Sequence, residues 1–432
     1  MAAMIAATAA PHATAQGTLT LRQCIEIAYS NSNTVKSYEL EVEKSENDLS
    51  TAKGQRLPSV SAYVGQSFDF GRGLNSNNTY ENRNTRNTSF SVSANMTLFS
   101  GMRITRNIEM QKINVATATE GLTAAKESLG VNVASAYLQA LCAKEQAEAA
   151  HEQARLSGEQ LKLKEALRDN GKASEADVAQ AKSLVAQDEL NAVRADNDYK
   201  LALLDLSQML ELPTPDGIVL SAPVESEPAS VVGGPEQVFQ EALAGKASIK
   251  TAQLKTQSAE KQVAIAKGEY WPTLTLSAGI STGYYGVSGI DNESFGNQLD
   301  QNLDKNVSLG LSIPIFNRFS TRNSVRSAKM NCTSAQIELD NERKTLYKDV
   351  QQAHYNAVAA ETAYSSSIAA EESAEEAYKL AEAKYARGLA SSTDFAEART
   401  NRTTAISTKI QYKYEMIFRT KILDFYRGVE IE

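Results

Sequence analysis

Two carboxylates near the C-terminus have a spacing that could form a charged site. Asp394 and Glu397 are three residues apart, so on a helix they would share one face. Asp177 holds the place of Asp394 in an earlier, similar stretch: GKASEADVAQAK at 171–182 resembles GLASSTDFAEAR at 388–399. Grouped acids attract cations, whereas an aspartate in the first turn of a helix also stabilises the helix dipole. The sequence leaves both interpretations open.

The residues that most often carry catalysis or bind metals do not form a recognisable site. The histidines are His12, His151 and His354, which do not occupy equivalent places in the repeat described below. The cysteines are Cys24, Cys142 and Cys332, which include no CxxC pair and cannot make a complete disulfide framework. The GRG at 71–73 opens an asparagine-rich loop rather than a helix, so it does not fit a dinucleotide motif. We therefore predict no enzyme, no cofactor and no metal site.

The similar stretches belong to a repeat that covers nearly the whole chain. QRLPSVSAYVG at 55–65 corresponds to EYWPTLTLSAG at 269–279. We expect residues 20–212 and 236–427 to be two copies of one design, joined by a proline-rich linker at 213–235. Residues 1–15 resemble the apolar part of a secretory signal ending in an A-x-A site; a floppy alanine-rich terminus is the alternative.

Composition argues against two protein classes. The chain has 432 residues and a net charge of −8, whereas a nucleic-acid-binding protein would need a basic stripe. Its mean hydropathy is −0.36, and no run of about 18 apolar residues is present, as a helical membrane protein would require.

Each half contains two segments in which apolar and polar residues alternate, as in a half-buried β-strand. From Thr88 to Phe99, phenylalanine, valine, alanine, methionine and leucine alternate with serine, asparagine and threonine. Strands of roughly 9–11 residues can cross a bilayer. We predict β-hairpins at 59–99 and 273–316 with long polar loops at 71–86 and 285–305. A soluble sandwich would show the same alternation.

The other segments predict unusually long helices. Residues 101–167 and 319–385 each have the composition of one continuous helix, and shorter helices are expected at 20–53, 174–212, 237–269 and 392–427. Ile406, Ile410 and Ile417 recur at nearly heptad spacing, which favours antiparallel coiled coils.

Four strands cannot close a barrel, and an open edge in lipid would leave backbone groups unsatisfied. Two chains would give a filled eight-stranded barrel and three a twelve-stranded barrel with a lumen.

This arrangement resembles the TolC family of outer-membrane efflux and secretion channels. The family's tip motif Y-x-x-G-x-x-S-x-x-D-V-x-x-A is matched by Tyr385, Gly388, Ser391, Asp394 and Ala398, and in the first half by Gly171, Ser174, Asp177, Val178 and Ala181. The resemblance implies an α+β fold of two tandem repeats. It also implies a homotrimer in which a 12-stranded β-barrel in the outer membrane of a Gram-negative bacterium continues as a periplasmic α-helical tunnel.

The resemblance also implies a function, partners and site residues. The channel would be the exit duct of a tripartite efflux or type I secretion system, working with a periplasmic adaptor (membrane fusion) protein and an inner-membrane pump of RND, ABC or MFS type. The periplasmic entrance would be formed by Asp177, Tyr385, Asp394 and Glu397, with Tyr385 bonded to Asp177. The adaptor-contacting tips would be formed by Arg168, Gly171, Ser174, Gly388, Leu389 and Ser391.

Three residues depart from the family pattern. Arg168 replaces the first tyrosine, Lys172 stands where leucine is common, and Ala390 stands where some relatives have a basic residue. A periplasmic coiled-coil adaptor or scaffold, which would need no lipid-facing strands, is the alternative function.

Overall fold

The computed structural model describes residues 18–74, 78–221 and 234–429. The signal-like segment 1–15 and much of the predicted linker lie outside the described residues. The chain divides into two compact units. Unit 1 comprises residues 1–39, 121–249 and 341–432, and unit 2 comprises residues 40–120 and 250–340.

The repeat appears in the lengths of the helices, because each half contains helices of 11, 22, 67 and 35 residues in that order. In the first half these are α1 (Leu21–Asn31), α2 (Asn33–Gly54), α3 (Arg103–Asp169) and α4 (Glu175–Met209). In the second half they are α5 (Pro235–Gly245), α6 (Ala247–Gly268), α8 (Ser320–Ala386) and α9 (Ser392–Tyr426).

The predicted helices at 20–53 and 237–269 are each interrupted once. Ser32 and Lys246 end α1 and α5 with ψ angles of 124° and 128°, outside the helical region, while their N–H groups still donate to Ala28 and Ala242. The long helices begin at Arg103 and Ser320 rather than at the predicted 101 and 319. The reason is that the two residues before each helix have positive φ angles.

Gly101 is required by a close backbone approach rather than by its φ angle. Its φ of 62° matches the φ of 55° at Arg318, the equivalent residue of the second repeat, so the conformation itself tolerates a side chain. A Cβ on Gly101 would, however, collide with the carbonyl oxygen of Gly268 and lie 2.8 Å from Cβ of Trp271.

Gly101→Ala should therefore lower the free energy of unfolding by about 1–3 kcal/mol through overpacking, in addition to the backbone strain that a side chain meets at this φ. Gly171→Ala is the matched control, because Gly171 has a similar φ of 71° and no atom within 4 Å of an added Cβ. That control should cost only about 1–2 kcal/mol of backbone strain. Thermal unfolding of the detergent-purified protein measures both, and equal losses would contradict the steric explanation.

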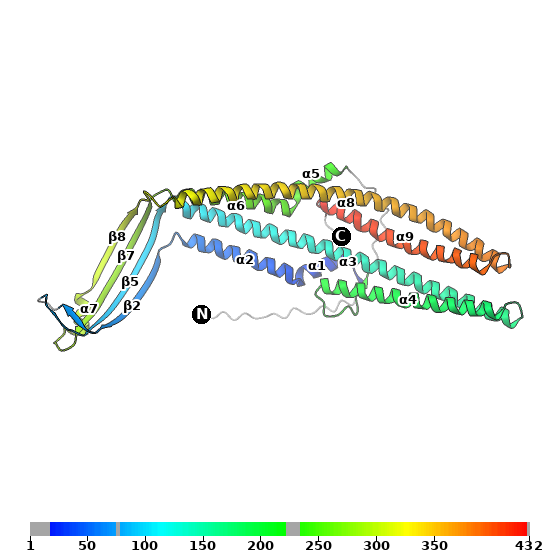
Figure 1. Ribbon diagram of the computed structural model, residues 1–432, viewed down its shortest axis with the longest axis horizontal. Coiled ribbons are helices and arrows are strands. Elements are labelled where there is room, and N and C mark those ends of the chain that lie inside the picture. Colours follow the sequence, from blue (N-terminus) through cyan, green and yellow to red (C-terminus); the bar gives the residue numbers. More distant parts are fainter. Residues whose placement is uncertain (1–17, 75–77, 222–233, 430–432) are drawn as a thin grey trace. The chain divides into compact units, whose positions relative to one another are not determined.

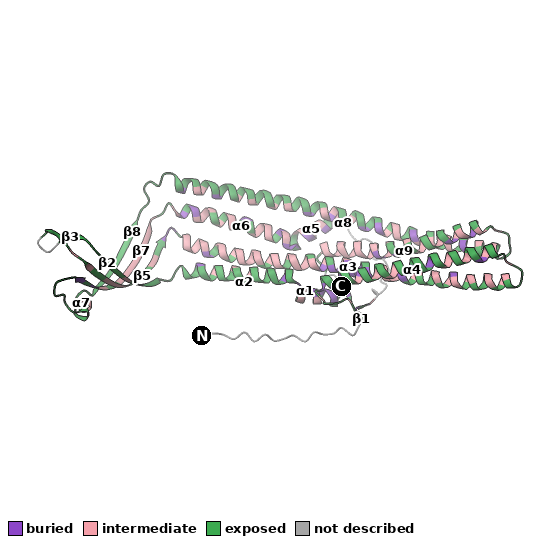
Figure 2. Cartoon of the chain, turned by 60° about the horizontal axis from the view of Figure 1, so that its bottom comes forward, coloured by how far each residue is buried: buried purple, intermediate pink, exposed green. Residues whose placement is uncertain are grey.

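Unit 2 contains one four-stranded sheet in the order β2-β5-β7-β8, with every neighbouring pair antiparallel. The strands are β2 (Ser59–Asp69), β5 (Thr85–Ser100), β7 (Thr273–Val287) and β8 (Asp304–Ser312). Their side-by-side order is visible in Figure 1. Figure 2 shows both edge strands, β2 and β8, as exposed along almost their whole length.

The register gives this sheet one apolar and one polar face. Val64, Phe90 and Thr282 are aligned across three strands, and Ala278 is aligned with Val307, so the apolar residues of all four strands share one side. The opposite side carries mainly small polar residues and glycine: Ser61, Ser93, Gly279 and Asn306, followed by Ser59, Asn95, Ser277 and Ser308. The alternation predicted from the sequence is confirmed.

The strand ends differ from the predicted hairpins. The predicted hairpin 273–316 reaches too far, because β8 ends at Ser312 and leaves Ile313 and Ile315 outside the ladder. Ser312 pairs with Thr273, the first residue of β7, and prolines at 272 and 314 limit further pairing because proline has no N–H group to donate. The polar loops are shorter than predicted: β7 extends to Val287, and the first loop contains the short paired strands β3 (Arg72–Leu74) and β4 (Tyr80–Asn82).

Helix α7 (Phe295–Gln301) in the second loop covers the end of β7, which the sequence did not predict. Three carboxamides bond the backbone of β7 beyond the last residue paired with β8: Asn302 donates to Gly283, Gln298 bonds both backbone groups of Tyr285, and Asn292 bonds both of Val287. Phe295 also packs on Tyr284, with ring centroids 5.3 Å apart. Tyr284 is therefore buried.

The core of unit 1 is formed by helices α1, α3, α4 and α9 and the short parallel strands β1 (Thr18–Leu19) and β6 (Val219–Leu220). The heptad-spaced isoleucines lie in this core: Ile410 is buried, and Ile406 and Ile417 pack against it. A second cluster joins α5, α6, α8 and α9. The antiparallel helical packing predicted from the sequence is thus present in unit 1.

Lys246 carries a buried amine beside this second cluster. Its Nζ lies 3.5 Å from Glu127 and 2.9 Å from the ring centroid of Phe425, and its side chain is 9% exposed. Desolvation by burial lowers the pKa of Lys246 from 10.5 to about 8, although Glu127 opposes the change.

The stability of the protein should therefore increase with pH through this group. Below pH 8 Lys246 is charged in both the folded and unfolded states, and above pH 10.5 it is neutral in both. Between these values the unfolded state binds more protons, so the free energy of unfolding should rise by about 3 kcal/mol. Lys246→Met should remove this rise in a pH series of thermal unfolding curves. Lys261→Met, which breaks an exposed pair with Glu109, should keep it.

Candidate functional site

Two helix reversals with the same geometry lie at one end of unit 1 (Figure 1). In the first, Gly171 N–H donates to Arg168 and Lys172 N–H to Leu167, each at 2.8 Å. In the second, the equivalent donors Gly388 and Leu389 bond Tyr385 and Lys384 at 3.0 and 2.9 Å. Both glycines have left-handed φ angles, 71° and 72°, which glycine adopts at little cost.

Each outgoing helix begins with a capping box. Ser174 accepts a bond from Asp177 N–H at 3.1 Å, and the Asp177 carboxylate accepts bonds from the Ser174 hydroxyl and N–H at 2.7 and 2.9 Å. Ser391 and Asp394 repeat the arrangement. These bonds from the cap serines lower the pKa of both aspartates. The carboxylates thus stabilise the helix starts and remain ionised at neutral pH.

Asp394 and Glu397 both lie exposed at this end of unit 1. Glu397 follows the capping aspartate by one turn and makes no ion pair with any residue that the structure describes. Because both carboxylates are on the same side of α9, one chain presents two negative charges to solvent here.

Tyr385 packs between an aromatic ring and a lysine. Its ring stacks on Phe395 with a centroid distance of 4.9 Å and an interplanar angle of 6°, and Lys164 Nζ lies 4.2 Å from its centroid. Lys164 is also close enough to Asp177 to contribute to lowering its pKa. Within one chain the described residues include no hydrogen bond between Tyr385 and Asp177; Lys164 interacts with both.

The remaining predicted tip residues surround the reversals. Arg168 is half-buried and pairs with Asp169 at 2.8 Å and with Glu175 at 3.7 Å. Leu389 is 73% exposed, which is unusual for a leucine on a turn and leaves an apolar side chain in solvent. The tips therefore combine charged groups with one protruding apolar group.

Neither a metal site nor a membrane-spanning helix is present in the described part of the chain. Among residues 18–74, 78–221 and 234–429, no three His, Cys, Asp or Glu side chains could together hold a metal ion. None of the described helices has both the length and the apolar character needed to cross a membrane.

Comparison with known proteins gives the family. Residues 24–211 and 238–422 match the family model for outer membrane efflux protein, which covers both repeats. The chain belongs to the outer membrane efflux protein family. The family's members are described as outer membrane efflux proteins, so the chain is an outer membrane protein.

Individual relatives of this efflux-family chain are distant. It is 26% identical to the outer membrane efflux protein BepC of Brucella suis over 74% of this chain and 66% of that protein. It is 24% identical to the pyoverdine export protein OpmQ of Pseudomonas putida over the same shares. The matched region thus spans slightly less than two thirds of these relatives. The structure of VceC from Vibrio cholerae has the same fold, with a TM-score of 0.77, 17% identity and coverage of 95% of this chain and 97% of that one.

A polar seam that was not predicted from the sequence joins the two helical hairpins of this efflux-family protein. Its residues are Gln153, Asp188 and Arg399, and further along Glu145 and Lys413. Arg399 of α9 bonds Asp188 of α4, and both side chains are buried. The Gln153 carboxamide, turned with its oxygen toward Arg399, accepts from Nε and Nη2 at 2.6 and 2.7 Å. Further along the seam, Lys413 pairs with Glu145 at 3.0 Å. These partners lie far apart in sequence, and no local motif marks them.

Proposed function

We propose that three copies of this chain form an outer-membrane channel that is the exit duct of a tripartite efflux or type I secretion system. The observation that carries this proposal is the four-stranded sheet, which has one apolar face, one polar face and two unpaired edges. An apolar face suits lipid and a polar face suits water, as in the wall of a membrane channel.

The unpaired edges support assembly of several copies. In a bilayer each free backbone group costs several kcal/mol, so a spanning sheet must close. Strands β2 and β8 run in opposite directions within the sheet, so β8 of one copy can form an antiparallel ladder with β2 of the next. Three copies give twelve strands, and the serine- and glycine-rich face then lines a lumen rather than filling a core.

The helical hairpins of unit 1 would extend into the periplasm of a Gram-negative bacterium. Their tips would bind a periplasmic adaptor protein, which connects the channel to an inner-membrane pump of RND, ABC or MFS type. The exposed Leu389 supports this role, because covering an apolar side chain with a partner protein is energetically favourable. Gly171, Ser174, Gly388 and Ser391 set the shape that the adaptor would recognise, and Arg168 contributes charge.

The acidic residues of the second tip would form the entrance. Three copies place six carboxylates of Asp394 and Glu397 around one opening, which favours cations and opposes anions. Asp177 and Tyr385, connected through Lys164, would hold the two hairpins of the closed entrance together.

Planar-bilayer conductance tests the channel and its entrance together. Asp394→Ala/Glu397→Ala should increase the single-channel conductance and reduce cation selectivity several-fold, because the carboxylates no longer repel anions at the narrow opening. The control is Glu372→Ala/Glu376→Ala, which removes two exposed carboxylates of α8 away from the reversals and should leave both properties nearly unchanged. If the tip mutation leaves conductance and selectivity unchanged, the barrier to ions lies elsewhere in the channel. Absence of pores, together with no heat-modifiable band in detergent gels, would favour the adaptor or scaffold function.

A further inference from the structure

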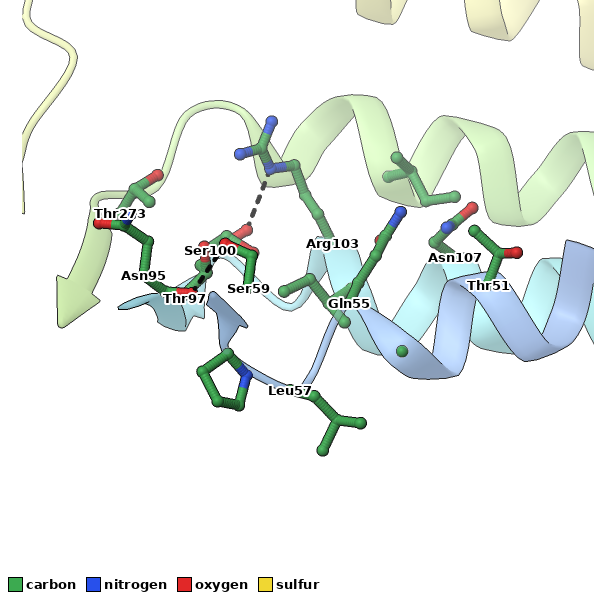
Figure 3. Close-up of a pocket in the computed structure, with 14 residues that line it drawn as sticks. Thr51, Gln55, Leu57, Ser59, Asn95, Thr97, Ser100, Arg103, Asn107 and Thr273 are labelled. Atoms are coloured by element: carbon green, nitrogen blue, oxygen red, sulfur yellow. Dashed lines mark hydrogen bonds between the residues drawn. The ribbon is translucent and has the colours of Figure 1, made fainter. Parts of the chain in front are cut away.

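A cavity of about 670 Å³ with both polar and apolar lining residues lies in unit 2 where the strands meet the helices. It is lined by the end of α2, the start of α3 and the nearby ends of β2, β5 and β7 (Figure 3). Five lining side chains carry a hydroxyl group: Thr51, Ser59, Thr97, Ser100 and Thr273. Three carry a carboxamide: Gln55, Asn95 and Asn107. The cavity is therefore rich in hydrogen-bond donors.

Arg103 gives this cavity an unbalanced positive charge. It is the one charged side chain among the lining residues, which include no aspartate or glutamate. Its Nε donates to the Ser100 carbonyl at 3.2 Å, the bond drawn in Figure 3. The two Nη groups have no acceptor, and Arg103 has no ion-pair partner, among the residues that the structure describes. Four N–H bonds of the guanidinium thus remain available to a ligand.

The position of Arg103 is fixed before any ligand binds. Its aliphatic stem packs so closely over Gly268 that a Cβ on that glycine would collide with it. The bond to Ser100 fixes the orientation of the guanidinium plane. A side chain that is already held loses little rotational freedom on binding, so more of the interaction energy appears as affinity.

The fold does not require arginine at this position. The equivalent residue of the second repeat is Ser320, which begins α8 just as Arg103 begins α3. Both helices have the same length, so the helix start forms equally well without the charge. The arginine is therefore a property of the cavity rather than of the helix.

We infer that this cavity binds a small water-soluble oxyanion, a carboxylate or phosphate group, through Arg103. The planar guanidinium bonds such groups with two parallel hydrogen bonds, and the surrounding amides and hydroxyls supply further donors. Ser59 and Asn95 belong to the polar face of the sheet, so the cavity opens on that face rather than on the apolar one. The site stands independently of the proposed channel; in such a channel it would contact passing cargo.

Arginine labelling of the detergent-purified, full-length protein tests the site without any transport assay. Phenylglyoxal should modify Arg103, and inorganic phosphate at about nine times its dissociation constant should slow that modification about tenfold, because only the unoccupied fraction reacts. Arg56, which bonds Thr105 at the same junction but does not line the cavity, is the internal control and should be modified at an unchanged rate. Chloride at equal ionic strength should protect neither residue. Mass spectrometry of the peptides measures both rates.

A second variant keeps the inference testable if the labelling alone is ambiguous. Asn107→Leu keeps Arg103 but removes a donor from the cavity, so it should reduce the phosphate protection several-fold while leaving the labelling rate without phosphate unchanged. Equal protection of Arg103 and Arg56, or no protection of either, would overturn the inference. Protection by phosphatidylglycerol but not by inorganic phosphate would likewise overturn it and assign the cavity to a lipid headgroup.

Discussion

Arg399→Met should lower the free energy of unfolding by about 3–5 kcal/mol per chain, because it leaves a buried carboxylate without its partner. Arg399 and Asp188 are only 8% and 7% exposed in their side chains, so water cannot replace the lost bond. Gln153 loses its donors in the same substitution. Thermal unfolding in detergent, followed by far-ultraviolet circular dichroism, measures the loss.

The internal repeat supplies the matched control for this prediction. Lys182 occupies the position of Arg399 in the first repeat but pairs with Glu165 of its own hairpin, at 3.5 Å and with side chains 58% and 37% exposed. Lys182→Met should therefore cost only about 0–1 kcal/mol. Removing both buried charges, as Asp188→Leu/Arg399→Met, should recover most of the stability. Equal losses for Arg399→Met and Lys182→Met would contradict the assignment of the seam as a buried ion pair.

The strands and their faces could be predicted because a strand has a period of two. Alternation at Phe90 and Val92 gives the apolar side of β5 directly. If the sheet is to have one apolar face, the strands must pair so that the apolar residues of neighbouring strands lie side by side. The carboxamides that bond β7 could not be predicted, because Asn292, Gln298 and Asn302 look like ordinary loop residues. Their role depends on β8 beginning only at Asp304, opposite Ser281, which is a property of the pairing.

Helix content was predictable, but some helix ends were not. The composition of 101–167, rich in alanine, glutamate, lysine and leucine and without proline, predicts one long helix. At the first break Ser32 Oγ accepts a bond from Val35 N–H, a local cap of the next helix, and before Arg103 both Gly101 and Met102 have left-handed φ angles.

The local part of the tip was predictable for a similar reason. Gly171 and Ser174 act on their own backbone, so a short motif is enough to identify a reversal and a cap. The contacts of Lys164 with Tyr385, and of Arg399 with Asp188, join helices from different repeats. Such pairs depend on how the hairpins pack, and a single sequence contains no local signal for them.

Val307→Arg should prevent the protein from assembling in the outer membrane. Val307 is 76% exposed at the middle of β8, on the apolar face and opposite Ala278. An arginine on the lipid side of a barrel costs roughly 2–4 kcal/mol near the midplane, and a trimer would contain three of them. The measurement is the amount of heat-modifiable protein in outer-membrane fractions, which should fall strongly relative to the unmodified chain.

Ser308→Arg provides the control, because the adjacent residue points to the opposite face and is aligned with Ser277 on the polar side. Facing water, this arginine should leave the amount of assembled protein nearly unchanged. The two substitutions add the same side chain to neighbouring positions of one strand, so β-propensity and expression effects are closely matched. If both assemble equally well, the apolar face does not contact lipid and the proposed barrel is wrong. If only Val307→Arg fails, the sheet spans the membrane with the serine-rich face inward.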